Sequence, residues 1–271
     1  MNAHVGGLAA RLSPVQASSI NVLSFAPSGE LLVGGCGYAH TIQIWSYKGG
    51  EPIAVLHGHS DQVSSLAFSH DGRFLLSGGL NGHLLLIDMV NLSVVREIHV
   101  GLGAIRGIAF ITDDMIVISC GSGTISTWSV QLSKEVERRI IEGASVGALA
   151  VCAAQGRLAL GCGDGTIRLW SLPNQAQVAH LIGHEGSVNS IQFNHDGSII
   201  ASGGSDEAVR LWNAEDGSAI GTLGPLEDAV QSVSFHPSAP SSAANIQSPS
   251  GIWRVNLQWT SVTASLMKLR R

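Results

Sequence analysis

The sequence has few charged residues, only four cysteines and no long apolar segment. The cysteines form no Cys-x-x-Cys pair and have no histidines at zinc-ligand spacing, so neither a disulfide framework nor a metal knuckle is indicated. No stretch approaches 18 consecutive apolar residues, and no uninterrupted apolar run opens the chain, which argues against membrane spanning and secretion. We therefore expect a globular protein in a reducing compartment, cytoplasmic and/or nuclear.

The charge distribution also excludes a general affinity for nucleic acid. The net charge is −5, and all 20 acidic residues lie at or before Asp228, whereas Arg254, Lys268, Arg270 and Arg271 follow it. The body up to residue 228 therefore carries −9 and the tail +4. Because binding through counterion release needs a clustered basic face, no nucleic-acid specificity is expected of the body.

A repeat with a period of about 42 residues organises the chain. Its anchors are separated by 43, 40, 42 and 42 residues, and they are Trp45, Asp88, Trp128, Trp170 and Trp212. In the fifth repeat, four short apolar runs are bounded by Gly-containing turns, and they cover 187–193, 195–204, 208–213 and 218–224. No stretch shows sustained helical periodicity. The pattern predicts an all-β protein with four strands in each repeat.

A single four-stranded sheet of this size cannot bury both faces, so such units are expected to stack radially. The repeats resemble those of the WD-repeat family, which carry Gly-His near one end and Trp-Asp near the other. Gly58-His59 and Gly183-His184 match the first element, and the four Trp anchors match the second. The resemblance covers residues 21–228 and implies a WD-repeat β-propeller with five secure four-stranded blades.

The resemblance also implies a buried hydrogen-bond network within a blade, formed by a His, a strand Ser, a turn Asp and the strand Trp. The fifth repeat matches it completely with His184, Ser202, Asp206 and Trp212. The second repeat keeps His59 and Ser77 but has Asn81 for the Asp and Ile87 for the Trp. Because half-satisfied buried networks are costly, we expect the departing blades to rely on apolar packing.

The two ends of the chain fall outside this pattern. Residues 1–20 are interpreted as an N-terminal extension that can supply a closing outer strand. Residues 229–271 are interpreted as a degenerate sixth repeat, with strands at 229–235, 254–259 and 261–267 and a loop at 236–250, or as a basic tail. A non-homologous ending from an alternative transcript stays open as an explanation of this segment.

No catalytic, cofactor or metal site is predicted. Residues 143–147 match Gly-x-Ser-x-Gly, but a nucleophile elbow needs a helix after the Ser, and a strand is expected there. The pairs His57 and His59, and His180 and His184, have spacings that suit a metal but no accompanying set of carboxylates or cysteines. The protein is therefore not expected to be an enzyme.

The favoured function is a non-catalytic scaffold that binds other proteins through propeller loops, as a subunit of a hetero-complex. The alternatives are an incomplete propeller completed by a partner subunit, and a propeller hydrolase. The loop with Gly-His and the turn with the network Asp are expected to share one rim. Candidate contact residues on this partner rim are Tyr38, His40, Asp61, Gln62, Leu80, Arg106, Glu185, Glu207 and Asp228.

Overall fold

The computed structural model describes residues 19–46, 52–131, 134–141, 143–172 and 176–235, together with three strands between 243 and 268. The regular structure of these residues is β-strand, without a helix, as the apolar runs and turn residues predict. Among them, no helix has the length and hydropathy that crossing a membrane requires. Residues 1–18 of the predicted extension, and with them its closing strand, lie outside the described residues.

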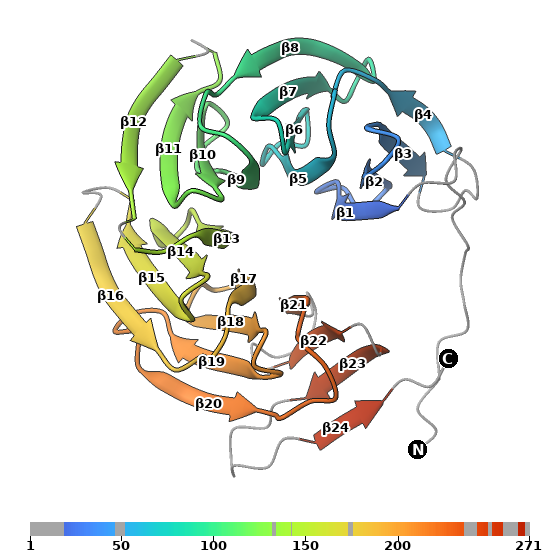
Figure 1. The fold of residues 1–271 in the computed structure, drawn as a ribbon. Helices are drawn as coiled ribbons and strands as arrows, with labels where there is room; N and C mark the ends of the chain where they lie inside the picture. Colours follow the sequence, from blue (N-terminus) through green and yellow to red (C-terminus); the bar gives the residue numbers. More distant parts are fainter. Residues whose placement is uncertain are drawn as a thin grey trace. The chain divides into compact units, whose positions relative to one another are not determined.

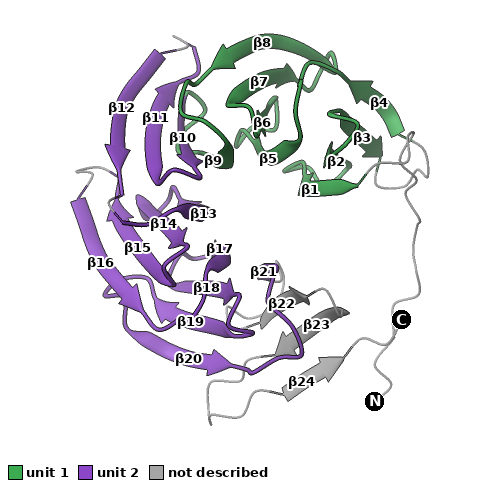
Figure 2. Cartoon of the chain, viewed as in Figure 1, with its two compact units in different colours: residues 1–114 green, residues 115–271 purple. Residues whose placement is uncertain are grey.

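The chain divides into two compact units, residues 1–114 and 115–271 (Figure 2). The strands of unit 1 are β1 (Ile20–Phe25), β2 (Leu31–Cys36), β3 (Ile42–Ser46), β4 (Pro52–Leu56), β5 (Val63–Phe68), β6 (Phe74–Gly79), β7 (His83–Asp88), β8 (Ser93–His99) and β9 (Ile105–Phe110). The strands of unit 2 are β10 (Met115–Cys120), β11 (Thr124–Ser129), β12 (Lys134–Ile140), β13 (Val146–Cys152), β14 (Arg157–Cys162), β15 (Thr166–Ser171), β16 (Ala176–Ile182), β17 (Val188–Phe193), β18 (Ile199–Gly204), β19 (Val209–Asn213), β20 (Ala219–Leu223), β21 (Ser232–Phe235), β22 (Ala243–Ser248), β23 (Gly251–Asn256) and β24 (Ser265–Lys268).

Each predicted repeat supplies four strands, and consecutive strands pair antiparallel (Figure 1). Unit 1 holds the sheets β1–β4 and β5–β8, and unit 2 holds β13–β16 and β17–β20. The third repeat is divided, with β9 in unit 1 and the antiparallel strands β10, β11 and β12 in unit 2. The prediction of five four-stranded repeats is confirmed.

The register between the second and third strands shows which residues occupy the anchor position. Trp45 pairs with Leu32, Trp128 with Ile116, Trp170 with Leu158, and Trp212 with Ile200. In the second repeat, the residue in this register is Ile87, which pairs with Leu75. The prediction of Asp88 as an anchor is therefore wrong by one residue. Asp88 instead holds the following turn, where it accepts hydrogen bonds from the backbone N–H groups of Val90 at 2.8 Å and Asn91 at 3.2 Å.

The core of each unit lies between the sheets of successive repeats. In unit 2, one buried cluster joins Ile167 and Leu169 of β15 to Val188 and Ile191 of β17 and to Trp212 of β19. The middle strands are buried on both faces, as in β18, where every residue after Ile199 is buried. From the second repeat to the fifth, the fourth strand is mostly exposed, as β8 illustrates. Burial therefore depends on one sheet covering the next.

Glycines in the second strands permit this close approach. A Cβ atom at Gly78 would lie 2.7 Å from Cγ2 of Ile105 in the next first strand of unit 1. A Cβ atom at Gly161 would lie 2.6 Å from Cγ1 of Val188 in unit 2. Real Cβ atoms are not found at such distances from other heavy atoms. Only glycine therefore lets the first strand of the next repeat pack against the sheet in this way.

Strands β21 to β24 follow the fifth repeat and pair antiparallel in sequence order. The prediction of a loop at 236–250 is wrong for residues 243–248, which form β22. Antiparallel pairing with β21 and β23 defines this strand, and main-chain hydrogen bonds of this kind form in a Ser-, Ala- and Pro-rich segment as well as in an apolar one. The first predicted strand is shorter than expected, at Ser232–Phe235. A degenerate sixth blade stays a prediction.

Candidate functional site

The network residues of the fifth repeat meet inside the sheet β17–β20, between the loop before β17 and the turn after β18. Nδ1 of His184 lies 2.8 Å from Oδ1 of Asp206, and Nε2 of His184 lies 2.8 Å from Oγ of Ser202. Nε1 of Trp212 donates to the same Ser202 oxygen at 2.9 Å. The structure therefore brings together all four residues that the resemblance implied.

The chemistry of the four groups fixes the direction of each hydrogen bond. An ionised carboxylate only accepts, so Nδ1–H of His184 donates to Asp206. Nε2 of the neutral ring then accepts from the Ser202 hydroxyl, whose oxygen accepts from the Trp212 N–H. Each donor among these four side chains has an acceptor, so the network leaves none of its own buried polar atoms without a partner.

Burial and hydrogen bonding set the charges in this network. Burial lowers the pKa of His184, and this outweighs the opposing effect of Asp206, so the ring is held neutral. Burial acts to raise the pKa of Asp206, but hydrogen bonds from His184 and from the N–H of Glu185 outweigh it, and the pKa lies below its usual value. Nη2 of Arg210 donates a further hydrogen bond to Oδ2 of Asp206 at 3.3 Å. Asp206 thus connects the Gly-His loop to the turn between β18 and β19.

The second repeat contains only part of this network. Nε2 of His59 lies 2.8 Å from Oγ of Ser77, as in the fifth repeat. Asn81 is turned elsewhere: its amide nitrogen donates to Ser60 at 2.8 Å, and its oxygen accepts from the N–H of His83 at 3.1 Å. Nδ1 of His59 has no hydrogen-bond partner among the described residues. Burial lowers the pKa of His59 to about 4, so this imidazole is neutral as well.

The hydrogen-bond partner of the anchor Trp differs between the third and fourth repeats. Nε1 of Trp128 donates to Oγ of Ser126, two residues earlier on β11, at 2.8 Å. In the fourth repeat Leu160 occupies the position of the network Ser, and within the described residues Nε1 of Trp170 has no hydrogen-bond partner. The guanidinium of Arg139 instead lies 5.4 Å from the centre of the Trp170 ring. Sequence reasoning did not identify Ser126, although its place two residues before the Trp, on the same face of the strand, was a usable signal.

The candidate partner rim falls into two groups, one in each unit. In unit 1, Tyr38 is 80% exposed, and the N–H of Leu80 donates to the carbonyl of Gln62 at 3.0 Å, which joins two of the predicted loops. Asp61 accepts a hydrogen bond from the N–H of Gln62. His40 has a left-handed backbone, with a φ of 53°. Arg106 is the second residue of β9, not part of a loop, and its side chain is exposed.

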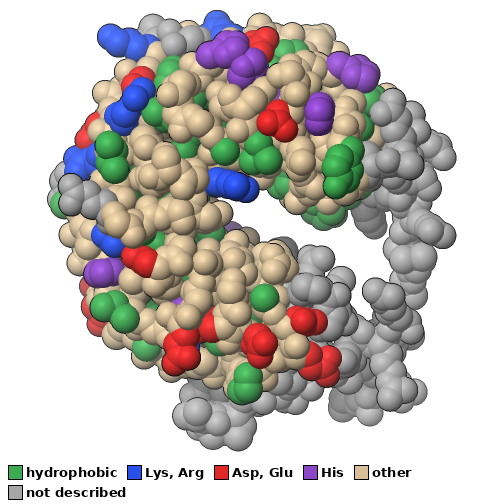
Figure 3. Space-filling model, viewed as in Figure 1, with side chains coloured by type: hydrophobic (Ala, Val, Ile, Leu, Met, Phe, Trp, Pro, Cys, Tyr) green, Lys and Arg blue, Asp and Glu red, His purple; other side chains and the backbone are tan. Residues whose placement is uncertain are grey.

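In unit 2, Glu185, Glu207 and Asp228 lie in three loops that are hydrogen-bonded to one another. The N–H of Glu185 donates to Asp206 at 3.1 Å, and the N–H of Leu226 donates to the carbonyl of Glu207 at 2.8 Å. Glu185 and Glu207 are exposed, whereas Asp228 is half-buried. Figure 3 shows acidic side chains gathered on one face of this unit.

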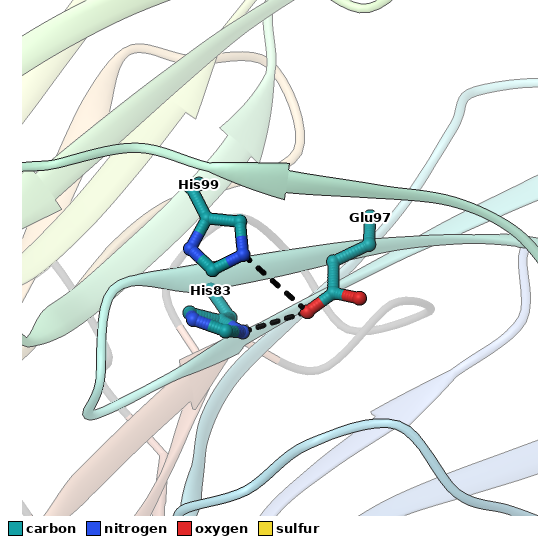
Figure 4. A group of neighbouring side chains, drawn as sticks. All are labelled: His83, Glu97 and His99. Carbon is teal, nitrogen blue, oxygen red and sulfur yellow. Dashed lines mark hydrogen bonds and ion pairs between the residues drawn. The ribbon is translucent and has the colours of Figure 1, made fainter.

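Sequence reasoning missed one group of side chains on β7 and β8 (Figure 4). His83, Glu97 and His99 have ligating atoms that all lie within 4.8 Å of one another. Glu97 and His99 are two residues apart on one strand, and His83 pairs directly with His99 across the hairpin. The spacing of Glu97 and His99 was a usable signal, but the position of His83 depends on the register of the hairpin.

The comparisons with known proteins agree with this architecture. The family model described as "WD domain, G-beta repeat" matches residues 50–88, 137–171 and 175–213. The solved "Structure of U3-55K" superimposes with a TM-score of 0.85 at 21% identity, over 95% of this chain and 83% of that one. At this identity, the likeness shows the fold alone.

Curated relatives match a smaller part of the chain. A "Periodic tryptophan protein 2 homolog" of Neurospora crassa is 32% identical over 118 residues, which is 43% of this chain and 13% of that protein. A "U3 small nucleolar RNA-associated protein 15 homolog" of Xenopus laevis is 32% identical over 124 residues, 45% of this chain and 23% of that protein. The chain thus spans less than a quarter of the length of either relative.

The network in the fifth repeat can be tested by the substitution Asp206→Asn. The amide keeps the size of the side chain but removes the negative charge of the carboxylate, which accepts hydrogen bonds from His184, Glu185 and Arg210. We expect the free energy of unfolding to fall by about 1–3 kcal/mol, measured by urea denaturation, because a buried charge-assisted hydrogen bond is lost. The control is Asp216→Asn, at an exposed turn where the carboxylate accepts from the N–H of Ser218 at 2.8 Å and has no ion pair among the described residues. Equal losses in the two variants would contradict a special role for Asp206.

Proposed function

Because the chain belongs to the WD-repeat family of β-propellers, we propose that it acts as a non-catalytic scaffold that holds other proteins in a hetero-complex. The observation that carries the proposal is the way the candidate rim is built. Within each unit, its loops are fixed by hydrogen bonds to one another, while Tyr38 in unit 1 and Glu185 and Glu207 in unit 2 remain exposed. Rigid loops with exposed side chains lose little conformational freedom on binding, which favours recognition of a partner.

The chemistry of the first strands supports a non-catalytic role. Strands β5, β9, β13 and β17 contain no carboxylate and no histidine. A propeller hydrolase would need such groups to converge from equivalent positions. The net charge of −5 supports a protein partner over a nucleic acid.

A nuclear complex is the favoured setting. One matched relative is named for its association with U3 small nucleolar RNA, and a solved neighbour is named U3-55K. These names describe those proteins, and they support a nuclear assignment for this chain without identifying its partner.

Charge reversal on the rim tests the scaffold. In the variant Asp61→Lys with Glu185→Lys, we expect partners to be lost from an affinity purification read by mass spectrometry, because complementary charges steer and orient a protein partner. The melting temperature should change little, because neither side chain contributes to a buried cluster and Asp61 gives up only its hydrogen bond from the neighbouring N–H of Gln62.

The matched control is Glu30→Lys with Glu215→Lys. Both acids are exposed, one in each unit, and both lie in hairpins at the opposite end of the strands from the rim. The control should retain its partners. Retention by the rim variant, or equal loss by both variants, would contradict the assignment of this rim.

A second candidate function is an incomplete propeller that a partner subunit completes. On β1, Leu23 is 56% exposed and Phe25 is 59% exposed. At the same register positions on β17, Ile191 is 7% exposed and Phe193 is 8% exposed. A further sheet packed against β1 would bury Leu23 and Phe25 as Ile191 and Phe193 are buried on β17. A partner subunit can supply this sheet.

Hydrogen exchange on the purified chain distinguishes a propeller that a partner subunit completes from one that the chain closes by itself. If a partner subunit is what covers β1, amides of β1 in the isolated chain should exchange at least tenfold faster than those of β17, because local stability follows burial. Adding the partner complex should slow exchange in β1. Equal protection of the two strands in the isolated chain, with slow exchange across 229–267, would leave no gap for a partner.

A further inference from the structure

The group formed by His83, Glu97 and His99 lies on the outer hairpin of the second repeat. Strand β8 is the fourth strand of its sheet, and six of its seven residues are exposed. Because side chains two residues apart share one face of a strand, Glu97 and His99 point the same way. His83 lies directly opposite His99 on β7, so all three side chains reach the same point, as Figure 4 shows.

The distances between the ligating atoms suit a single metal ion. Nδ1 of His83 is 2.7 Å from Oε1 of Glu97, and Nε2 of His99 is 3.8 Å from the same oxygen. A tetrahedral zinc ion binds nitrogen and carboxylate oxygen at about 2.0–2.2 Å, which places two ligands roughly 3.4 Å apart. The observed separations lie on either side of this value. Glu97 and His99 are exposed and His83 is half-buried, so the first two side chains have room to adjust toward this separation.

We propose that His83, Glu97 and His99 bind one zinc ion, with water at the fourth position. Two imidazoles and one carboxylate form the donor set of open zinc sites, whereas calcium and magnesium prefer oxygen ligands alone. The site faces solvent, so a water molecule has access to the remaining position. The two strands of a paired hairpin hold the ligands, which reduces the conformational freedom that binding removes.

The histidine pairs that sequence spacing suggested do not offer such a site. Both ring nitrogens of His184 are engaged in the network of the fifth repeat. Nε2 of His59 is bonded to Ser77 inside the sheet. The nitrogens of His83 and His99, in contrast, converge on a carboxylate at the surface.

Isothermal titration of the purified, chelator-treated full chain with zinc chloride tests the proposal. We expect saturable binding of one ion, and a cobalt(II)-loaded sample should show visible d–d absorption bands of the intensity typical of four-coordinate sites. The variant His83→Gln with His99→Gln should lose the cobalt bands and bind zinc at least tenfold more weakly. The melting temperature of the ion-free variant should stay close to that of the wild type, since His99 is exposed and the Gln amide at position 83 can still donate to Glu97.

The matched control is His180→Gln, an exposed histidine on β16, the corresponding outer strand of the fourth repeat. This variant should bind zinc and cobalt as the wild type does. Absence of saturable binding by the wild type, or equal binding by the double variant, would overturn the proposal. Loss of binding in His180→Gln would also overturn it, because the ion would then lie elsewhere.

Discussion

The structure depends on the close approach of each sheet to the first strand of the next repeat. A four-stranded sheet of this length buries its inner face only when another sheet covers it, and the buried clusters accordingly draw side chains from successive repeats. Glycines at the ends of the second strands leave the space that Ile105 fills in unit 1 and Val188 in unit 2. Any larger residue there would push the sheets apart and open the core along the contact.

Hydrogen bonding adds a second level of organisation, and it varies between repeats. In the fifth repeat, one chain of donors and acceptors runs from Trp212 to Asp206 and fixes a loop and a turn. In the second repeat, Asn81 bonds to Ser60 instead, and His59 keeps a single partner. The four-stranded sheet forms in both cases. Apolar packing therefore decides the fold, and in the fifth repeat the network adds hydrogen bonds between a loop and a turn.

Most of the fold could be predicted from the sequence because its signals are local. Apolar runs bounded by Asp-Gly and Gly-Gly placed the four strands of the fifth repeat to within a few residues of β17–β20. Comparison of the network residues puts Ile87 in the place of the Trp, and the register of β6 and β7 agrees with it, so the error is limited to taking Asp88 as the anchor of the repeat spacing. Strand β22 escaped prediction because the segment around it is rich in Ser, Ala and Pro, whereas the pairing of strands is made by main-chain hydrogen bonds.

The candidate site was less predictable because its contacts join distant residues. The network of the fifth repeat could be listed by resemblance, yet the rotation of Asn81 toward Ser60 could not be seen in the sequence. The convergence of His83, Glu97 and His99 depends on which residues face each other across β7 and β8. A shift of one residue in that register would have sent His83 to the opposite face.

The most direct test of this account is the urea unfolding of Gly161→Ala beside Gly221→Ala. At Gly161 an added methyl group would meet Val188 and Ala148, whereas at Gly221 it would meet nothing within 4 Å. If contact between successive repeats controls stability, Gly161→Ala should lower the free energy of unfolding by about 1–3 kcal/mol. Gly221→Ala should leave it unchanged or raise it by up to about 1 kcal/mol. Equal effects of the two substitutions would contradict the account.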